Sequence, residues 1–204
     1  MAIQAVLTGD IVNSTRLGPA AEKKLLKVLH QVLSAHRYEF YRGDSFQAYL
    51  KNAEDALTVA LLCRAAAISI TAEAPADVRI SIGMGKTKTP GHPLGTARGE
   101  AFVLSGRAFD ELAKQDTRLA IASTNALANA GLQVIAAYGN AIFKEMTGKQ
   151  ALVVFALLQG ATQQEAAAQL KKSKSTIHQH VSAGRWPEIE TLVQQYKNIV
   201  NQLL

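Results

Sequence analysis

The first part of the chain alternates between short apolar runs and longer amphipathic segments. Apolar residues at helical spacing predict helices over residues 19–36, 52–72 and 99–114. Short apolar or alternating runs predict strands over residues 3–8, 38–41, 45–50, 78–84 and 119–122. The predicted order is β-α-β-β-α-β-α-β. The hairpin turn Arg42-Gly43-Asp44 favours an α+β fold with a sheet that contains antiparallel strands.

From about residue 125 the pattern becomes entirely helical. Residues 125–146 fit one long helix, or two shorter helices broken near Gly139. Four further helices are predicted over 149–159, 162–170, 174–183 and 187–203. This change predicts three parts: an α+β domain over 1–123, a helical connector over 124–146, and an all-α domain over 147–204.

Charge and composition narrow the functional classes. The net charge is +6, and five bases lie between residues 149 and 185 against one acid, Glu165, which favours a polyanion as a partner of the C-terminal part. The single cysteine, Cys63, excludes a disulfide within the chain. The apolar stretch near residues 56–70 contains Arg64 and is too short to span a bilayer, and the N-terminus has no secretory pattern. We therefore expect a cytoplasmic protein with no membrane partner.

The stretch TQQEAAAQLKKSKSTIHQHV, residues 162–181, has the layout of a helix-turn-helix. Thr162 and Glu165 form a capping box at the start of the first helix, and Ser173 caps the second. Ile177 and Val181 lie one turn apart and point inward. The turn and the outward-facing residues near the start of the second helix are polar or basic, as in a helix that reads the major groove. The residues expected to contact DNA are Lys171, Lys172, Ser173, Lys174, Ser175, Thr176, His178 and Gln179.

The stretch resembles sigma-factor-like and other bacterial helix-turn-helix modules, with their pattern T-Q-x-E-x-A-x-x-L-x-x-S-x-x-T-[IV]. Such modules usually carry glycine and an aliphatic residue where this chain has Lys171 and Lys172. The alternative is a plain helical hairpin that binds protein or nothing. The final helix carries apolar residues such as Ile189 and Tyr196 at alternating spacings of three and four. That stripe fits packing on the helix-turn-helix and fits a dimer seam equally well.

Two acidic residues stand at turns of the predicted α+β domain. Asp10, in GDIVNST, follows the first predicted strand, and Asp44 lies at the tip of the hairpin. Each alone is consistent with a turn or a helix cap. If the two strands are neighbours, both carboxylates meet at one edge of the sheet. A Mg²⁺–phosphate site is then expected there, because carboxylate oxygens hold a hard cation and a helix start holds phosphate.

Four stretches in order resemble the class III nucleotide cyclases: DIVNST, GDSFQAYL, VRISIGMGKT and GEAFVLSGRAF. The resemblance implies a cyclase-like, ferredoxin-like sheet and head-to-tail homodimers. Carried over residue by residue, it implies metal ligation by Asp10 and Asp44, phosphate binding by Ile11, Val12, Asn13, Ser14 and Thr15, base recognition by Thr96, and triphosphate binding by Arg107.

Two positions depart from the cyclase pattern. Phe40 stands where these enzymes have a base-selecting lysine, and Val103 where they have a ribose-orienting asparagine. Neither side chain can make those hydrogen bonds, and metal-assisted cyclisation depends on positioning. We therefore expect cyclase activity to be lost or much reduced, with Phe40 able instead to stack on a base.

The whole arrangement resembles the bacterial SatD family, with a short cyclase-like domain, a connector and a C-terminal helix-turn-helix. This resemblance implies a transcription factor whose degenerate cyclase-like domain senses a nucleotide. Mg²⁺ is the cofactor expected with that nucleotide. Two alternatives stay open: an active or residual cyclase that uses the two aspartates, and a catalytically dead cyclase fold that serves only for dimerisation.

Overall fold

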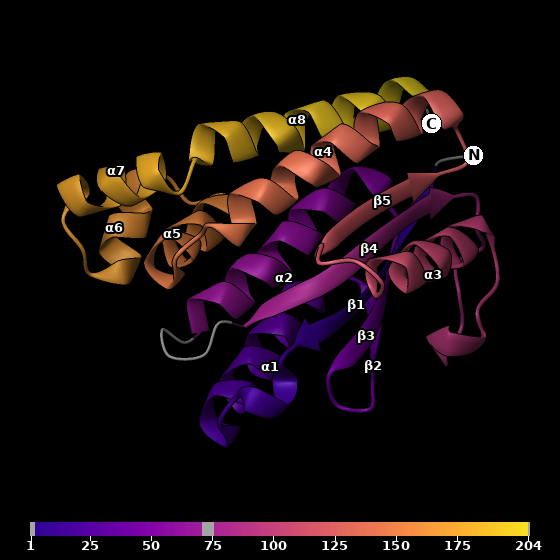
Figure 1. The fold of residues 1–204 in the computed structure, drawn as a ribbon, viewed down its shortest axis with the longest axis horizontal. Coiled ribbons are helices and arrows are strands. Elements are labelled where there is room, and N and C mark those ends of the chain that lie inside the picture. Colours follow the sequence, from indigo (N-terminus) through magenta and orange to yellow (C-terminus); the bar gives the residue numbers. More distant parts are fainter. Residues whose placement is uncertain (1–2, 71–75, 204) are drawn as a thin grey trace.

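A computed structural model describes residues 3–70 and 76–203 and contains a five-stranded sheet in the order β2-β3-β1-β4-β5 (Figure 1). The strands are β1 (Gln4–Val12), β2 (Arg37–Tyr41), β3 (Ser45–Leu50), β4 (Asp77–Gly85) and β5 (Leu119–Ser123). β1 runs antiparallel to both β3 and β4, whereas β4 and β5 are parallel. The expected α+β fold with antiparallel pairing is confirmed.

The helices follow the predicted order. They are α1 (Pro19–Leu33), α2 (Ala56–Ile70), α3 (Glu100–Leu112), α4 (Ala126–Lys144), α5 (Gly148–Leu158), α6 (Gln163–Leu170), α7 (Lys174–Ala183) and α8 (Trp186–Leu203), with short 3₁₀ turns η1 (Ser14–Arg16), η2 (Ala53–Asp55) and η3 (Leu94–Thr96). Residues 125–146, for which the sequence allowed either one long helix or two shorter ones, contain the single helix α4. Gly139 is buried within α4, where a Cβ atom would meet Leu119 Cδ2 at 3.4 Å, so this glycine packs against the sheet rather than breaking the helix. The predicted end of the second helix, at Ala72, lies outside the described residues.

The two faces of the sheet are covered differently. Alternate residues of β1, such as Leu7 and Ile11, belong to a core shared with α1, α2 and α4. The other face packs against α3 along β1, β4 and β5. This approach is close enough to require a glycine, because a Cβ atom on Gly83 would lie 2.2 Å from the backbone nitrogen of Ser105.

β1 extends further than the predicted strand over residues 3–8. It continues to Val12, which pairs with Asp77, because β4 provides a hydrogen-bonding partner along its whole length. Asp10 therefore lies inside the strand and not at a junction between strand and helix. Asn13, in the left-handed conformation with φ 60°, ends the strand. The apolar pattern could not show this extension, because the last residues of β1 are held by a partner far away in the sequence.

The C-terminal helices pack onto the sheet domain. α4 and α8 lie side by side, and α5, α6 and α7 gather at one end of the molecule (Figure 1). A single hydrophobic core includes residues of β1, α4, α5 and α8. The Tyr196 hydroxyl of α8 donates a hydrogen bond of 2.8 Å to the Ala53 carbonyl of η2. The apolar stripe of α8 is thus buried within the chain, which favours internal packing over a dimer seam. The division at residues 123 and 146 stays a prediction, since the core is continuous across both positions.

α4 is also the one helix among the described residues that is long and apolar enough to cross a membrane by length and composition. In the fold, α4 packs against β5 on one side and α8 on another. Its Asn140 side chain makes polar contacts to the sheet, so that α4 serves as a core helix of this domain.

Candidate functional site

Asp10, the first predicted metal ligand, is held by an arginine of the neighbouring strand. Its two carboxylate oxygens accept hydrogen bonds from Arg79 Nε at 3.0 Å and Arg79 Nη2 at 2.7 Å. The two side chains are 20% and 22% exposed, so the pair is largely shielded from water. Hydrogen bonding to Asp10 raises the pKa of Arg79 above its ordinary value, so the guanidinium stays charged. Arg79 also lies over the ring of Phe109 on α3, 5.5 Å from its centroid.

Asp44, the second predicted ligand, does meet the end of β1. Its backbone carbonyl accepts a hydrogen bond from the Ile11 amide at 3.0 Å. Its carboxylate accepts one from the Ser14 hydroxyl at 2.9 Å and a longer one from Ser45 at 3.3 Å. The hairpin turn and the end of β1 are therefore neighbours, which is the condition that the predicted site requires.

These two carboxylates do not fit a bound Mg²⁺ in this arrangement. Both oxygens of Asp10 face a guanidinium, and a divalent cation needs those oxygens for itself. Asp44 accepts hydrogen bonds from two hydroxyl groups, that of Ser14 in η1 and that of the adjacent Ser45. Within the described part of the chain, no three or more His, Cys, Asp or Glu residues gather as a metal site would require. The metal site stays a prediction that demands movement of Arg79.

Phe40 lies on the opposite face of the sheet from Asp10. Phe40 pairs with Phe46, whereas Asp10 pairs with the adjacent residue Ser45, and successive residues of a strand point to opposite faces. The Phe40 ring packs against Phe46 and His30, with ring centroids 5.4 and 4.6 Å away. The structure therefore does not bring Phe40 to a site beside Asp10; its ring contributes to the core beneath α1.

The remaining predicted nucleotide contacts are dispersed. Ile11 is buried in the core, so its side chain cannot reach a ligand, whereas Thr15 is exposed in η1. Thr96 is exposed in η3 and donates a hydrogen bond to the Pro93 carbonyl. Arg107 is exposed on α3 and lies about 200° around the helix from Ser105, which faces the sheet. Within one chain, Arg107 does not meet Asp10.

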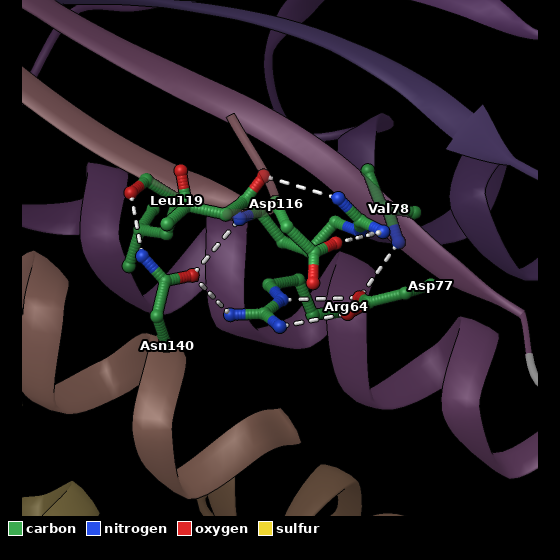
Figure 2. A network of polar contacts seen from close by, with 8 residues as sticks. Arg64, Asp77, Val78, Asp116, Leu119 and Asn140 are labelled. Atoms are coloured by element: carbon green, nitrogen blue, oxygen red, sulfur yellow. Dashed lines mark hydrogen bonds and ion pairs between the residues drawn. The ribbon is translucent and has the colours of Figure 1, made fainter. Parts of the chain in front are cut away.

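Val12, the last residue of β1, and Asn13 instead line a large cavity at this end of the strand. The cavity has a volume of about 1050 Å³ and lies between α2, the starts of β4 and β5, and the corner from α4 to α5. Arg64 forms part of its floor and is almost fully buried. Arg64 Nε and Nη2 bind the two oxygens of Asp77 at 3.0 and 2.7 Å, and Nη1 binds Asn140 Oδ1 at 3.2 Å (Figure 2).

Asn140 extends this network to β5. Its Oδ1 also accepts from the Arg118 backbone amide at 3.1 Å, and its Nδ2 donates to the Leu119 carbonyl at 2.9 Å (Figure 2). The network ties α4 to α2 and to two strands. Sequence reasoning missed this site, although one signal existed: Arg64 interrupts an otherwise apolar helix, and a charge in such a place needs a buried partner.

The helices α5, α6 and α7 form a compact unit with its own hydrophobic cluster. Ile177 and Val181 of α7 point into this cluster, as predicted. The capping box at Thr162 and the cap at Ser173 are both present. The other members of the cluster are Val153, Ala156, Leu157, Ala166 and Ala167.

Most residues predicted to contact DNA lie on the outer surface of this unit. Those exposed are Lys171, Lys172, Ser173, Lys174, Ser175, His178 and Gln179. Thr176 is half-buried, and its hydroxyl lies 2.8 Å from the Ser173 hydroxyl, so these two residues also stabilise the start of α7. Lys171 adopts the left-handed conformation, with φ 51° and ψ 47°. The turn thus has the usual geometry of a helix end, with lysine where glycine is usual.

No family model matches this chain, and no curated protein matches it. Two solved structures of a bacterial light-regulated adenylyl cyclase are similar in fold. One has a TM-score of 0.40 and 16% identity and covers 59% of this chain and 42% of that chain. The other has a TM-score of 0.42 and 16% identity and covers 67% of this chain and 80% of that chain. This chain therefore spans less than half of the first cyclase chain. Likeness at this level carries no information about ligand or activity, and the SatD resemblance stays a prediction.

Proposed function

We propose that this protein is a DNA-binding regulator whose α6–α7 unit reads duplex DNA and whose α+β part responds to a small ligand. The observation that carries the proposal is the division of α7 into two faces. Ile177 and Val181 hold one face in a small core, while the start of the other face is polar and exposed beside a lysine-rich turn. Exposed lysines can neutralise phosphates, and Gln179 and His178 can bond to base edges.

Two copies acting together are part of this proposal. A helix-turn-helix that binds as a dimer reads two half-sites about one helical turn of DNA apart. The resemblance to cyclases also implies a homodimer. The stripe of α8 does not provide the seam, because Ile189, Tyr196 and Val200 are buried within the chain. A cytoplasmic location fits this function and is part of the proposal.

Catalysis is not part of the proposal, and the reason lies in the site itself. Asp10 is paired with Arg79, Phe40 is half-buried against the core on the opposite face, and Val103 is exposed where the cyclase pattern has asparagine. These residues do not assemble a metal-dependent site in one chain.

The test begins with a selection of binding sites from a random-sequence duplex library, followed by titrations on the enriched duplex over a range of salt. We expect an enriched motif with two-fold symmetry. The triple variant K171A/K172A/K174A should lose affinity, and the slope of log K against log salt should fall by about 0.9 for each phosphate contact removed.

The matched control removes the same charge from another helix. Lys23, Lys24 and Lys27 are exposed on α1, far from α7, so K23A/K24A/K27A changes the net charge equally. The control should bind DNA as the unaltered protein does. Equal loss in both triple variants would mean that affinity depends on total charge alone, and the DNA-reading role of α7 would be rejected.

A further inference from the structure

A cavity lies where the sheet domain meets the helices that hold α7. Its volume of about 1050 Å³ is at the upper end of the range for small-molecule sites. The predicted metal ligands Asp10 and Asp44 do not line it, whereas Val12 and Asn13, two of the residues predicted to bind phosphate, do.

The charged groups of the cavity favour an anion. Arg64 is neutralised by Asp77 in the floor. At the rim, Asp116 faces two cations, with Arg118 at 3.2 Å and Lys144 at 3.7 Å. Lys149 on the first turn of α5 adds a further cation. The lining side chains thus carry an excess of two positive charges, which attracts anionic ligands into a partly enclosed space.

The start of α5 adds backbone donors to the same wall. A capping box bonds the amides of Thr147 and Gln150. The first amides of a helix have no partner inside the helix, so the capping box leaves the amides of Gly148 and Lys149 for an external acceptor. Both residues line the cavity. A phosphate at this position would meet these donors together with the rim cations.

Part of the lining is apolar. Ile68, Phe143 and Met146 line this part of the cavity, and the Phe143 ring already lies 4.9 Å from the Arg64 guanidinium. A ligand that fills this space therefore needs an apolar or aromatic portion as well as its anionic group. Such a combination is typical of nucleotide-sized phosphorylated molecules.

α5 connects this cavity with the DNA-reading unit. Lys149 at its start lines the cavity, while Val153, Ala156 and Leu157 further along pack in the cluster that holds α7. A ligand that contacts the start of α5 therefore acts on the helix against which α7 rests.

We propose that this cavity binds a phosphorylated small molecule with an aromatic portion, and that its occupancy changes how α7 engages DNA. The site itself does not depend on the proposed function, whereas the effect on DNA does. The probes are ATP, GTP, cyclic AMP, cyclic di-AMP, cyclic di-GMP and inorganic pyrophosphate. Binding of each probe to the full chain is measured by calorimetric titration and by the shift in unfolding temperature, with Trp186 fluorescence as the signal.

Two kinds of variant locate the binding. K144A/K149A removes two exposed cations of the rim, and A141W fills the cavity from an exposed position of α4. We expect each to weaken binding of the stabilising probe at least about tenfold. The matched controls are K23A/K27A on α1 and A137W, one turn earlier on α4 and outside the cavity, and both should bind normally. If A141W fails to fold, K144A/K149A still tests whether the probe binds in the cavity.

Three results would overturn the inference. No binding by any probe would reject the phosphorylated class. Binding that survives both K144A/K149A and A141W, yet is lost in D10A, would return the ligand to the sheet edge. Binding at the cavity that leaves DNA affinity unchanged, in a protein that binds DNA, would reject the coupling. Ligand binding at the cavity with no DNA binding at all would instead reject the proposed function and leave the site standing.

Discussion

Asp10 and Arg79 face each other across β1 and β4 and are joined by two hydrogen bonds, of 3.0 and 2.7 Å. The two residues pair directly in the strand register, so the backbone itself brings the carboxylate to the guanidinium. Because Asp10 is paired with an arginine, its role differs from that of a free metal ligand. It is a member of a structural ion pair, and any cation must compete with a positive charge that is already in place.

The first prediction concerns this pair. D10N and R79M should each destabilise the fold by about 1–3 kcal/mol, because each leaves a partly buried polar partner without its counterpart. The double variant should lose less free energy of unfolding than the two single variants together, and the difference, the coupling energy of the pair, should be about 0.5–3 kcal/mol. Urea unfolding of the four proteins measures this cycle.

The effect of Mg²⁺ on the unfolding temperature tests whether Asp10 is free to bind a metal. The unaltered protein should show no rise in unfolding temperature with Mg²⁺, while R79M exposes Asp10 to solvent and to cations beside Asp44. A clear stabilisation of the unaltered protein by Mg²⁺, abolished by D10N, would contradict the structural interpretation of the pair. It would show that Arg79 yields to the metal.

The second prediction concerns Arg64. R64M should destabilise the protein by about 3 kcal/mol, because a buried ion pair loses one partner while Asp77 remains. The loss should lie at the lower end of the usual range, since the Asp77 side chain is 18% exposed and can gain some water. Urea unfolding gives the value. K114M is the control, because that lysine forms an exposed ion pair with Glu111, three residues before it, and its loss should cost much less than that of Arg64.

Tyr196 gives a pH-dependent prediction. Burial raises the pKa of its hydroxyl far above the ordinary value of 10.0. The folded state therefore keeps this proton when the unfolded state releases it. Stability from this group is complete below about pH 10 and falls above it, by up to about 1.4 kcal/mol per pH unit.

The comparison with Y196F separates this group from the others that ionise in alkali, such as Cys63 and Tyr41. Near neutral pH, Y196F should be less stable by about 1–2 kcal/mol, because the Ala53 carbonyl loses its donor. Above about pH 10 the difference between the two proteins should shrink. Urea unfolding at about pH 8 and about pH 11 measures it, and a constant difference would exclude ionisation of Tyr196.

The order of elements could be predicted because it depends on local pattern. The spacing of apolar residues located the helices around Leu25, Leu57 and Ile177, and the turn residues located the hairpin at Gly43. Caps such as Ser173 were also visible, since a hydroxyl three residues before a donor is a local feature. These elements are confirmed.

The polar partnerships could not be predicted in the same way. Arg79 lies 69 residues from Asp10, and only the register of β1 on β4 brings them together. Likewise, Arg64 of α2 and Asn140 of α4 are 76 residues apart and are joined only in the folded chain, by a hydrogen bond between their side chains. A motif such as GDIVNST gives the chemical type of a residue, but its partner is decided by tertiary packing.

The last prediction concerns the turn between α6 and α7. Lys171 has φ 51°, a left-handed conformation that costs a residue with a side chain about 1 kcal/mol relative to glycine. The bonds from the Lys172 amide to Ala167 and from the Lys171 amide to Ala168, of 3.0 and 3.3 Å, are those of a Schellman motif. K171G should therefore stabilise the fold by about 0.5–1 kcal/mol in urea unfolding.

The same variant should weaken DNA binding, because one phosphate contact is lost and the salt slope falls by about 0.9. K172G removes the same charge next to it but relieves no left-handed residue, so it should weaken binding without a gain in stability. Opposite signs for stability and affinity in K171G would mean that lysine is kept at a strained position for its charge. A loss of stability in K171G would mean instead that its aliphatic chain supports the turn, and the electrostatic role of Lys171 would need another explanation.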